Sequence, residues 1–131
     1  MVQVLVVDDR PDVRLSFLYM LQAIGYDVAE ACDGYTALEY MQSKPVDVLL
    51  TDLFMPGMDG VGLVETVINT PRRRPALVVM TGEPPSKTSR RLEAARRLGV
   101  QVLEKPITRD QLESAIKRAA QGLPAATAGR K

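Results

Sequence analysis

Short runs of consecutive apolar residues alternate along the chain with stretches in which apolar residues recur every three or four positions. Valine-rich runs of this length predict strands that are buried on both faces. We expect such strands at 2–7, 46–50 and 76–80, and shorter strands near 28–31 and 102–104. Parallel sheets are almost always covered on both faces, and their strands read as continuous apolar runs, so the pattern favours a parallel sheet.

The stretches between these runs have helical spacing. In the first of them Val13, Phe17, Leu21 and Ile24 share one face, and Gly25 is suited to end the helix. Similar patterns predict helices at 35–41, 60–69, 87–98 and 110–120. Five strands that alternate with five helices, (βα)₅, predict a doubly wound α/β fold, because right-handed crossovers place helices on both faces of a parallel sheet.

Composition is consistent with one globular domain, since 46% of the 131 residues are hydrophobic and 25% are charged. We place this domain at 1–121 and a flexible C-terminal tail at 122–131, where the periodicity ends. The chain has neither an 18-residue apolar run nor a basic segment ahead of a hydrophobic one, which predicts a soluble, cytoplasmic protein. Cys32, the only cysteine, excludes an internal disulfide, and we expect a buried thiol.

Charge is divided unevenly although the net charge is only +1. Residues 1–71 contain 3 basic and 11 acidic side chains, whereas residues 72–131 contain 14 and 5. The predicted fourth helix is strongly basic, with Lys87, Arg90, Arg91, Arg96 and Arg97. No aromatic residues are interleaved with these cations, so the pattern favours a solvated face or a dock for an acidic partner over direct nucleic-acid binding. The absence of histidine excludes a phosphohistidine or a histidine-ligated metal within this chain.

Polar residues suited to chemistry follow four of the predicted strands: Asp8 and Asp9, then Asp52, Thr81 and Lys105. Ligands of open α/β sheets bind at the carboxyl ends of the strands. Converging carboxylates repel one another and require a cation, and a site of oxygen ligands favours Mg²⁺ or Mn²⁺. Each residue taken singly has an ordinary explanation as a helix cap, a turn or a surface charge. Their joint placement favours a site for phosphoryl transfer, in which one carboxylate is a candidate nucleophile.

Four sequence segments, in this order, resemble the receiver domains of bacterial response regulators, in particular chemotaxis receivers. They are Val-Asp-Asp at 7–9, Leu-Thr-Asp-Leu-Phe-Met-Pro-Gly-Met-Asp-Gly at 50–60, Met-Thr-Gly at 80–82 and Lys-Pro at 105–106. The resemblance covers residues 1 to about 121. It implies a flavodoxin-like sheet with strand order 2-1-3-4-5, and a function in two-component signal transduction.

The resemblance also implies a role for each matched residue. Asp52 is the expected phosphoacceptor. Asp8, Asp9, Asp52 and the main-chain carbonyl of Phe54 are the expected ligands of Mg²⁺ or Mn²⁺. The chain would catalyse only its own phosphorylation and dephosphorylation and would not be an enzyme in the ordinary sense.

On the phosphoryl side, Thr81 and Lys105 are the expected partners of the phosphoryl oxygens, and the bond to Pro106 is expected to be cis. The expected donor is a histidine kinase or a histidine phosphotransfer protein. The expected output face comprises the fourth helix, fifth strand and fifth helix, which would bind a downstream protein and is also available for a homodimer. No membrane contact is expected.

Three positions depart from the family pattern. Val102 stands where receivers usually have the aromatic residue that rotates on activation. Phe54 and Glu83 occupy places linked to the rate of dephosphorylation, and we hypothesise that Phe54 hinders the attacking water. The segment 81–99 also has about three residues more than is common.

The sequence is also compatible in part with two other classes of protein. An aspartate-nucleophile phosphohydrolase would need a second acidic residue close after Asp52 and usually a cap domain, whereas position 54 is Phe and the chain is short. A pseudo-receiver that binds a partner without phosphorylation stays open because of Val102 and the altered spacing.

Overall fold

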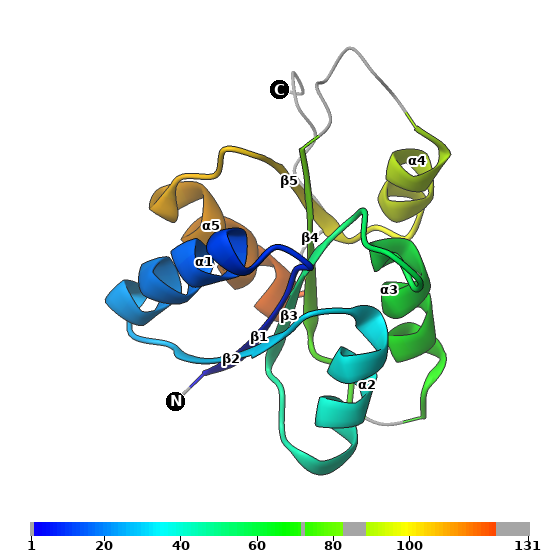
Figure 1. The fold of residues 1–131 in the computed structure, drawn as a ribbon, viewed down its shortest axis with the longest axis horizontal. Helices are drawn as coiled ribbons and strands as arrows, with labels where there is room; N and C mark the ends of the chain where they lie inside the picture. Colours follow the sequence, from blue (N-terminus) through cyan, green and yellow to red (C-terminus); the bar gives the residue numbers. More distant parts are fainter. Residues whose placement is uncertain (1, 72, 83–88, 123–131) are drawn as a thin grey trace.

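The computed structural model describes residues 2–71, 73–82 and 89–122. Strands and helices alternate along this part of the chain (Figure 1). The strands are β1 (Gln3–Val7), β2 (Asp27–Ala31), β3 (Val48–Asp52), β4 (Ala76–Thr81) and β5 (Gln101–Glu104). The helices are α1 (Pro11–Ile24), α2 (Gly34–Ser43), α3 (Gly60–Asn69), α4 (Arg90–Arg97) and α5 (Arg109–Ala120).

The strands form one parallel sheet in the order β2-β1-β3-β4-β5. This arrangement confirms the predicted α/β fold and its strand order. Helices α1 and α5 cover one face of the sheet, and α2, α3 and α4 cover the other (Figure 1). Such a three-layer arrangement buries the sheet on both sides, as the valine-rich runs predicted.

Alternate residues of each central strand enter different cores. In β1, Val4 and Val6 pack with α1 and α5, whereas Leu5 and Val7 pack with the helices of the opposite face. All four side chains are buried, because β1 lies between β2 and β3 and is covered by helices on both sides. The two cores hold the strand ends in a fixed register.

The first helix ends before Gly25, as its sequence predicted. Pro11 occupies its first turn, where a missing main-chain N–H costs nothing. Gly25 follows it with a positive φ of 108°, and the N–H of Gly25 donates to the carbonyl groups of Leu21 and Gln22. A left-handed residue at this position suits glycine and closes the helix.

Several predicted boundaries were wrong by one to three residues, and β3 and α4 show the largest differences. Strand β3 runs to Asp52 and begins at Val48, two residues later at each end than the apolar run indicated. Thr51 and Asp52 are polar but buried, and a search for apolar residues therefore ended the strand too early. Helix α4 begins at Arg90, where the side chain of Ser89 caps it by accepting from the N–H of Leu92.

Cys32 is exposed, which contradicts the expected buried thiol. Strand β2 is an edge strand that ends at Ala31, and Cys32 lies in the connection to α2, beyond the core. Residues 83–88, with Glu83 and Lys87, lie outside the described residues, as does the predicted C-terminal tail apart from Gly122. No helix within the described part is long and apolar enough to cross a membrane.

Candidate functional site

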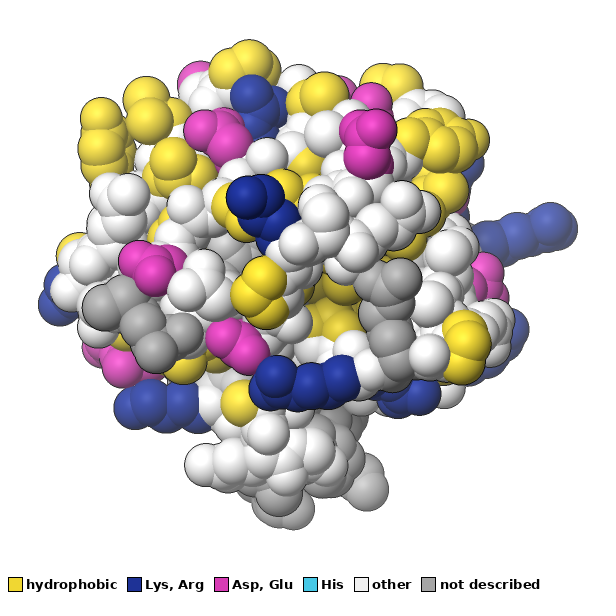
Figure 2. Space-filling model, turned by 90° about the horizontal axis from the view of Figure 1, so that it is seen from below, with side chains coloured by type: hydrophobic (Ala, Val, Ile, Leu, Met, Phe, Trp, Pro, Cys, Tyr) yellow, Lys and Arg dark blue, Asp and Glu magenta, His cyan; other side chains and the backbone are white. Residues whose placement is uncertain are grey.

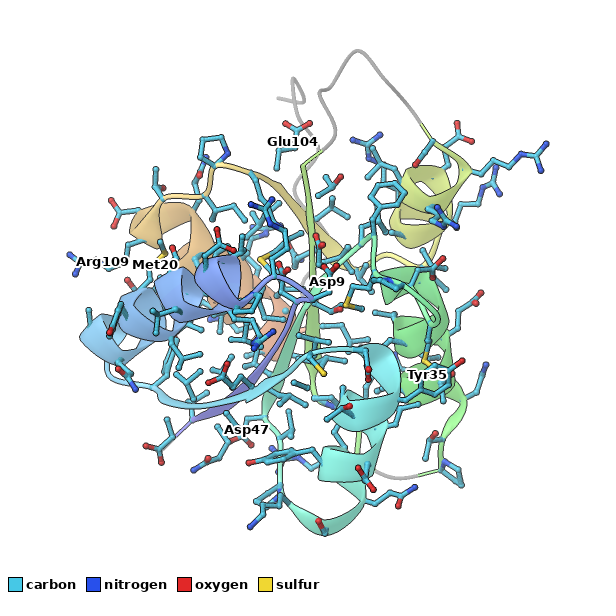
Figure 3. The ribbon with its side chains drawn as sticks, viewed as in Figure 1. Asp9, Met20, Tyr35, Asp47, Glu104 and Arg109 are labelled. Atoms are coloured by element: carbon cyan, nitrogen blue, oxygen red, sulfur yellow. The ribbon has the colours of Figure 1, made fainter. Side chains whose placement is uncertain are left out.

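The carboxyl ends of the central strands bring the predicted site residues to one edge of the sheet. Asp8 directly follows β1, Asp52 ends β3, Thr81 ends β4 and Lys105 directly follows β5. Figure 3 shows Asp9 at the same edge, in the connection between β1 and α1. Parallel pairing explains this convergence, because every strand ends on the same side of the sheet.

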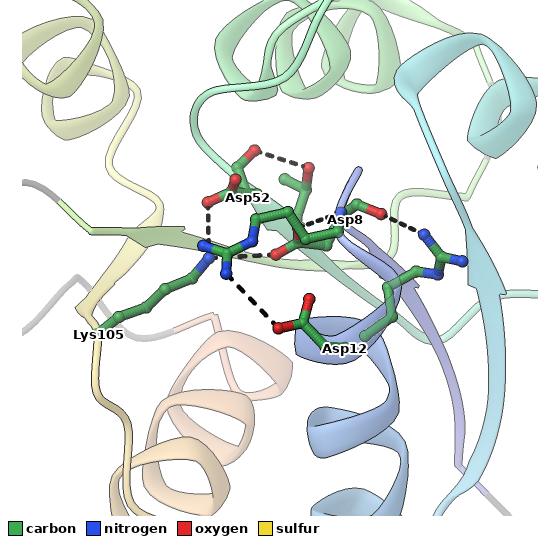
Figure 4. A network of polar contacts seen from close by, with 7 residues as sticks. Asp8, Asp12, Asp52 and Lys105 are labelled. Atoms are coloured by element: carbon green, nitrogen blue, oxygen red, sulfur yellow. Dashed lines mark hydrogen bonds and ion pairs between the residues drawn. The ribbon is translucent and has the colours of Figure 1, made fainter.

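Lys105 links two carboxylates that are distant in sequence (Figure 4). Its Nζ atom lies 3.1 Å from Oδ2 of Asp8 and 3.1 Å from Oδ1 of Asp52. Asp8 is fully buried, and the side chains of Asp52 and Lys105 are 11% and 22% exposed. Charges withdrawn from water to this extent need partners, so Lys105 is the counter-charge of both carboxylates.

The main chain fixes the position of Lys105. Its N–H donates to the carbonyl oxygen of Thr81 at 2.8 Å. The following peptide bond, to Pro106, is cis, as expected from the resemblance. Thr81 itself is fully buried at the end of β4.

Asp8 is held independently of Lys105. Its Oδ1 atom accepts the N–H of Arg10 at 3.0 Å, and its own N–H donates to the carbonyl of Ala31 at 3.2 Å. The guanidinium of Arg14 donates to the carbonyl oxygen of Asp8 at 2.8 Å and to Glu30 at 2.8 Å. Asp8 is therefore positioned before any ligand arrives.

The connection after Asp52 folds back closely on the strand. The N–H of Leu53 donates to Met80 at 2.7 Å, and its carbonyl accepts the N–H of Gly60 at 2.9 Å. A Cβ atom at Gly60 would collide with the main-chain oxygen of Asp52, so only glycine permits this approach. The start of α3 thus supports the strand end that carries Asp52.

Three carboxylates are close enough to share one ion. One oxygen from each of Asp8, Asp9 and Asp52 lies within 4.8 Å of the others, and Asp9 is exposed while the other two are buried. Burial raises the pKa of Asp52, and the charge of Asp8 raises it further, whereas Lys105 acts in the opposite direction. One ammonium thus leaves a surplus of negative charge, and this oxygen-only donor set fits a hard divalent cation such as Mg²⁺.

Two of the positions that depart from the family pattern, Val102 and Phe54, lie within the described residues. Val102 is half-buried in β5 and packs on the core beneath α2, α3 and α4. Phe54 is half-buried, and the guanidinium carbon of Arg91 lies 5.3 Å from the centroid of its ring. The same arginine pairs with Asp59, at 2.7 Å. The sequence pattern marked Arg91 only as part of a basic helix and did not connect it to the site.

Comparison with known proteins agrees with this geometry. The sequence profile of the family described as "Response regulator receiver domain" matches residues 4–117. This chain is a member of that family. It therefore belongs to the receiver domains of two-component and phosphorelay signalling.

Curated relatives of this receiver domain include both short and long proteins. The chain is 30% identical over 119 residues to a probable chemotaxis protein CheY of Rhizobium etli, covering 88% of this chain and 90% of the relative. It is 34% identical over 116 residues, or 82% of its length, to the gliding motility regulatory protein of Myxococcus xanthus, of which it spans 15%. It is 31% identical over 113 residues, or 86% of its length, to the sensor histidine kinase RcsC of Salmonella typhi, of which it spans 12%. Receiver sequences of this kind thus occur both as most of a protein and as a small part of one.

A solved structure shows the same fold. The crystal structure titled FIXJ-N superposes with a TM-score of 0.81 and 29% sequence identity, covering 96% of this chain and 98% of that one.

Proposed function

We propose that this receiver domain accepts a phosphoryl group on Asp52 from a phosphohistidine of a histidine kinase or phosphotransfer protein, with Mg²⁺ bound. The observation that carries the proposal is the arrangement at Asp52. Its carboxylate is paired with Lys105 at 3.1 Å and lies within 4.8 Å of two more carboxylates. Charges of both signs that converge on one strand end are suited to phosphoryl transfer, where catalysis is mostly positioning and charge neutralisation.

Asp8, Asp9, Asp52 and the carbonyl of Phe54 would hold the metal, which would neutralise charge on the phosphoryl oxygens when bound. In the transfer, an oxygen of Asp52 forms a bond to phosphorus while the bond from phosphorus to the donor nitrogen breaks. Asp52 must be ionised to attack, and Lys105 favours that ionised form against the effect of burial.

After transfer, the ammonium of Lys105 would neutralise a phosphoryl oxygen. The hydroxyl of Thr81 would donate a hydrogen bond to another, which draws the end of β4 toward the phosphate. Such a movement biases an equilibrium between two conformations of the surface formed by α4, β5 and α5. The exposed arginines of α4, namely Arg90, Arg91, Arg96 and Arg97, give this surface a charge suited to an acidic downstream protein.

Phe54 is proposed to slow the loss of the phosphoryl group by hindering the attacking water. Replacing Phe54 with Ala should therefore shorten the lifetime of phosphorylated Asp52, measured by intact mass after removal of the donor. An unchanged or longer lifetime would contradict this role. Glu83, the second position expected to affect this rate, remains a proposal from the sequence.

The decisive test is intact mass spectrometry after incubation with acetyl phosphate and Mg²⁺. The wild-type chain should gain one phosphoryl group, whereas Asp52→Asn and a sample treated with EDTA should gain none. Since acyl phosphates hydrolyse, short reaction times must be included. No adduct on the wild-type chain at any time would refute phosphorylation and favour a module that acts by binding alone.

A further inference from the structure

One side chain of α4 contacts both ends of the connection that follows Asp52. The Nε atom of Arg91 donates to Oδ2 of Asp59 at 2.7 Å, and its guanidinium carbon lies 5.3 Å from the ring centroid of Phe54. Phe54 lies near the start of the connection between β3 and α3, and Asp59 is its last residue. Arg91 therefore bridges the two ends of this segment from a separate helix.

Asp59 uses its two carboxylate oxygens for different partners. Oδ1 accepts the N–H of Gly62 at 2.8 Å and so caps the start of α3, while Oδ2 pairs with Arg91. The side chains of Asp59 and Arg91 are 25% and 55% exposed. A single carboxylate at the end of the Asp52 connection thus joins α3 to α4.

Phe54 is packed on the core from one side only partly, and Arg91 covers its ring from α4. The preceding Leu53 is anchored through both its N–H and its carbonyl group, and Gly60 is pressed against the main chain of Asp52. The ring of Phe54, between these anchors, is only half-buried, and the cation of Arg91 lies over it. An arginine over an aromatic ring is attractive electrostatically and restricts the ring.

We propose that Arg91 is a positioning residue for the Asp52 site. It holds Phe54 and Asp59 so that the connection keeps the arrangement that receives the metal and limits the access of water to phosphorylated Asp52. The inference rests on the proposed function. The inference goes beyond that function because it assigns a positioning role at the Asp52 site to a residue of α4, outside the acidic cluster.

The same contacts couple α4 to the phosphorylation site. Any displacement of α4 changes the distance from Arg91 to Phe54 and Asp59, and by linkage a change at the site alters the position favoured by α4. This connection is direct and needs no aromatic residue at position 102. A partner that binds α4 should therefore change the affinity of the site for Mg²⁺.

Four substitutions separate this role from general stability. Arg91→Gln removes the cation from both contacts, and Arg90→Gln removes a neighbouring exposed charge of the same helix as the matched control. Asp59→Asn keeps the helix cap but weakens the ion pair. Arg91→Lys keeps the charge but loses the planar group that stacks on a ring, so it should restore the function only in part.

The first measurement uses the metal-free protein and does not depend on phosphorylation. Amide hydrogen exchange, followed by NMR, should be faster for Gly60 and Gly62 in Arg91→Gln than in the wild type or in Arg90→Gln. The second set comprises the affinity for Mg²⁺ and the phosphoryl lifetime at Asp52. Each should fall about two- to fivefold in Arg91→Gln, because two weak contacts are lost together. Asp59→Asn should show a smaller loss.

The outcomes are distinguishable. If the wild type is phosphorylated but Arg91→Gln matches Arg90→Gln in Mg²⁺ affinity and lifetime, the role of Arg91 is refuted and the proposed function stands. A change in thermal stability alone, without a change in these two quantities, also refutes it. A wild-type chain that neither binds Mg²⁺ nor accepts a phosphoryl group would overturn both proposals.

Discussion

The two ends of the sheet carry ion pairs of similar length in different surroundings. At the carboxyl ends of the strands, Lys105 lies 3.1 Å from both Asp8 and Asp52, and all three side chains are at most 22% exposed. At the opposite end, Arg73 lies 3.3 Å from Asp47, with exposed fractions of 83% and 29%. Distance therefore does not distinguish the two, whereas solvent does, because water screens an exposed pair and leaves a buried pair at nearly full strength.

The surface around the second pair is hollowed. Figure 2, which views the molecule from below Figure 1, shows apolar side chains at the floor of this hollow. The cavity has a volume of about 780 Å³, and its lining includes Arg73, Arg74, Leu77 and Ile116. Its charges lie at a solvated rim, so they stabilise the fold little. Of these two ends of the sheet, the carboxyl edge is the one where charges are withdrawn from water and need partners.

Of the substitutions considered for these two ion pairs, Lys105→Met should lower the free energy of unfolding the most. Two carboxylates would lose their shared cation, and we expect a loss of roughly 2–3 kcal/mol in the free energy of unfolding at neutral pH. Lys117→Met is the control, because Lys117 is 62% exposed and pairs with Glu113 within α5. Urea denaturation followed by circular dichroism at 222 nm measures both.

The deficit of Lys105→Met should shrink as the pH is lowered, since protonated carboxyl groups need no cation. Mg²⁺ should restore part of it by supplying positive charge at the same place. If Lys105→Met is as stable as the Lys117→Met control, the buried ion pairs of Lys105 stabilise the protein no more than an exposed pair does.

Asp52→Asn should have the next largest effect on stability. Whether it stabilises or destabilises the protein depends on the pH and on Mg²⁺. Burial raises the pKa of Asp52, so the folded protein binds a proton more readily than the unfolded chain does. The wild type therefore loses stability as the pH rises through the folded pKa, and the neutral variant does not. In metal-free buffer at neutral pH, Asp52→Asn should melt a few degrees higher than the wild type, and this difference should vanish below the ordinary pKa of aspartate.

Adding Mg²⁺ should reverse that order, because binding to the folded state stabilises the protein with the complete carboxylate set. Thermal melts with and without Mg²⁺ at several pH values test both statements. A wild type that is more stable than Asp52→Asn without metal at neutral pH would contradict the assigned electrostatics.

Arg73→Gln should have the smallest effect. This pair is exposed on its arginine side, and we expect a change below about 0.5 kcal/mol in the free energy of unfolding. Urea titrations at low and high salt should give nearly the same result for this variant. A loss comparable with that of Lys105→Met would remove the distinction between the two edges.

The sequence predicted the elements of the fold better than their exact ends and the burial of polar residues. The existence of the valine-rich strands and the end of α1 before Gly25 were predicted correctly, because burial and capping leave local patterns. The strand order came from the resemblance to a family. The end of β3 was missed since Thr51 and Asp52 are polar residues in a buried strand, and Cys32 was misjudged because an apolar neighbourhood in sequence does not reveal an edge strand.

The sequence by itself determined the parallel α/β fold, the membership of the chain in the receiver family and the residue types at each strand end. Tertiary structure alone decided which of these residues meet. Lys105 pairs with residues 97 and 53 positions away, and Arg91 joins Phe54 to Asp59 from another helix. Local patterns indicate which apolar runs are buried. Contacts between distant segments depend instead on how the layers pack, and packing is a property of the whole fold.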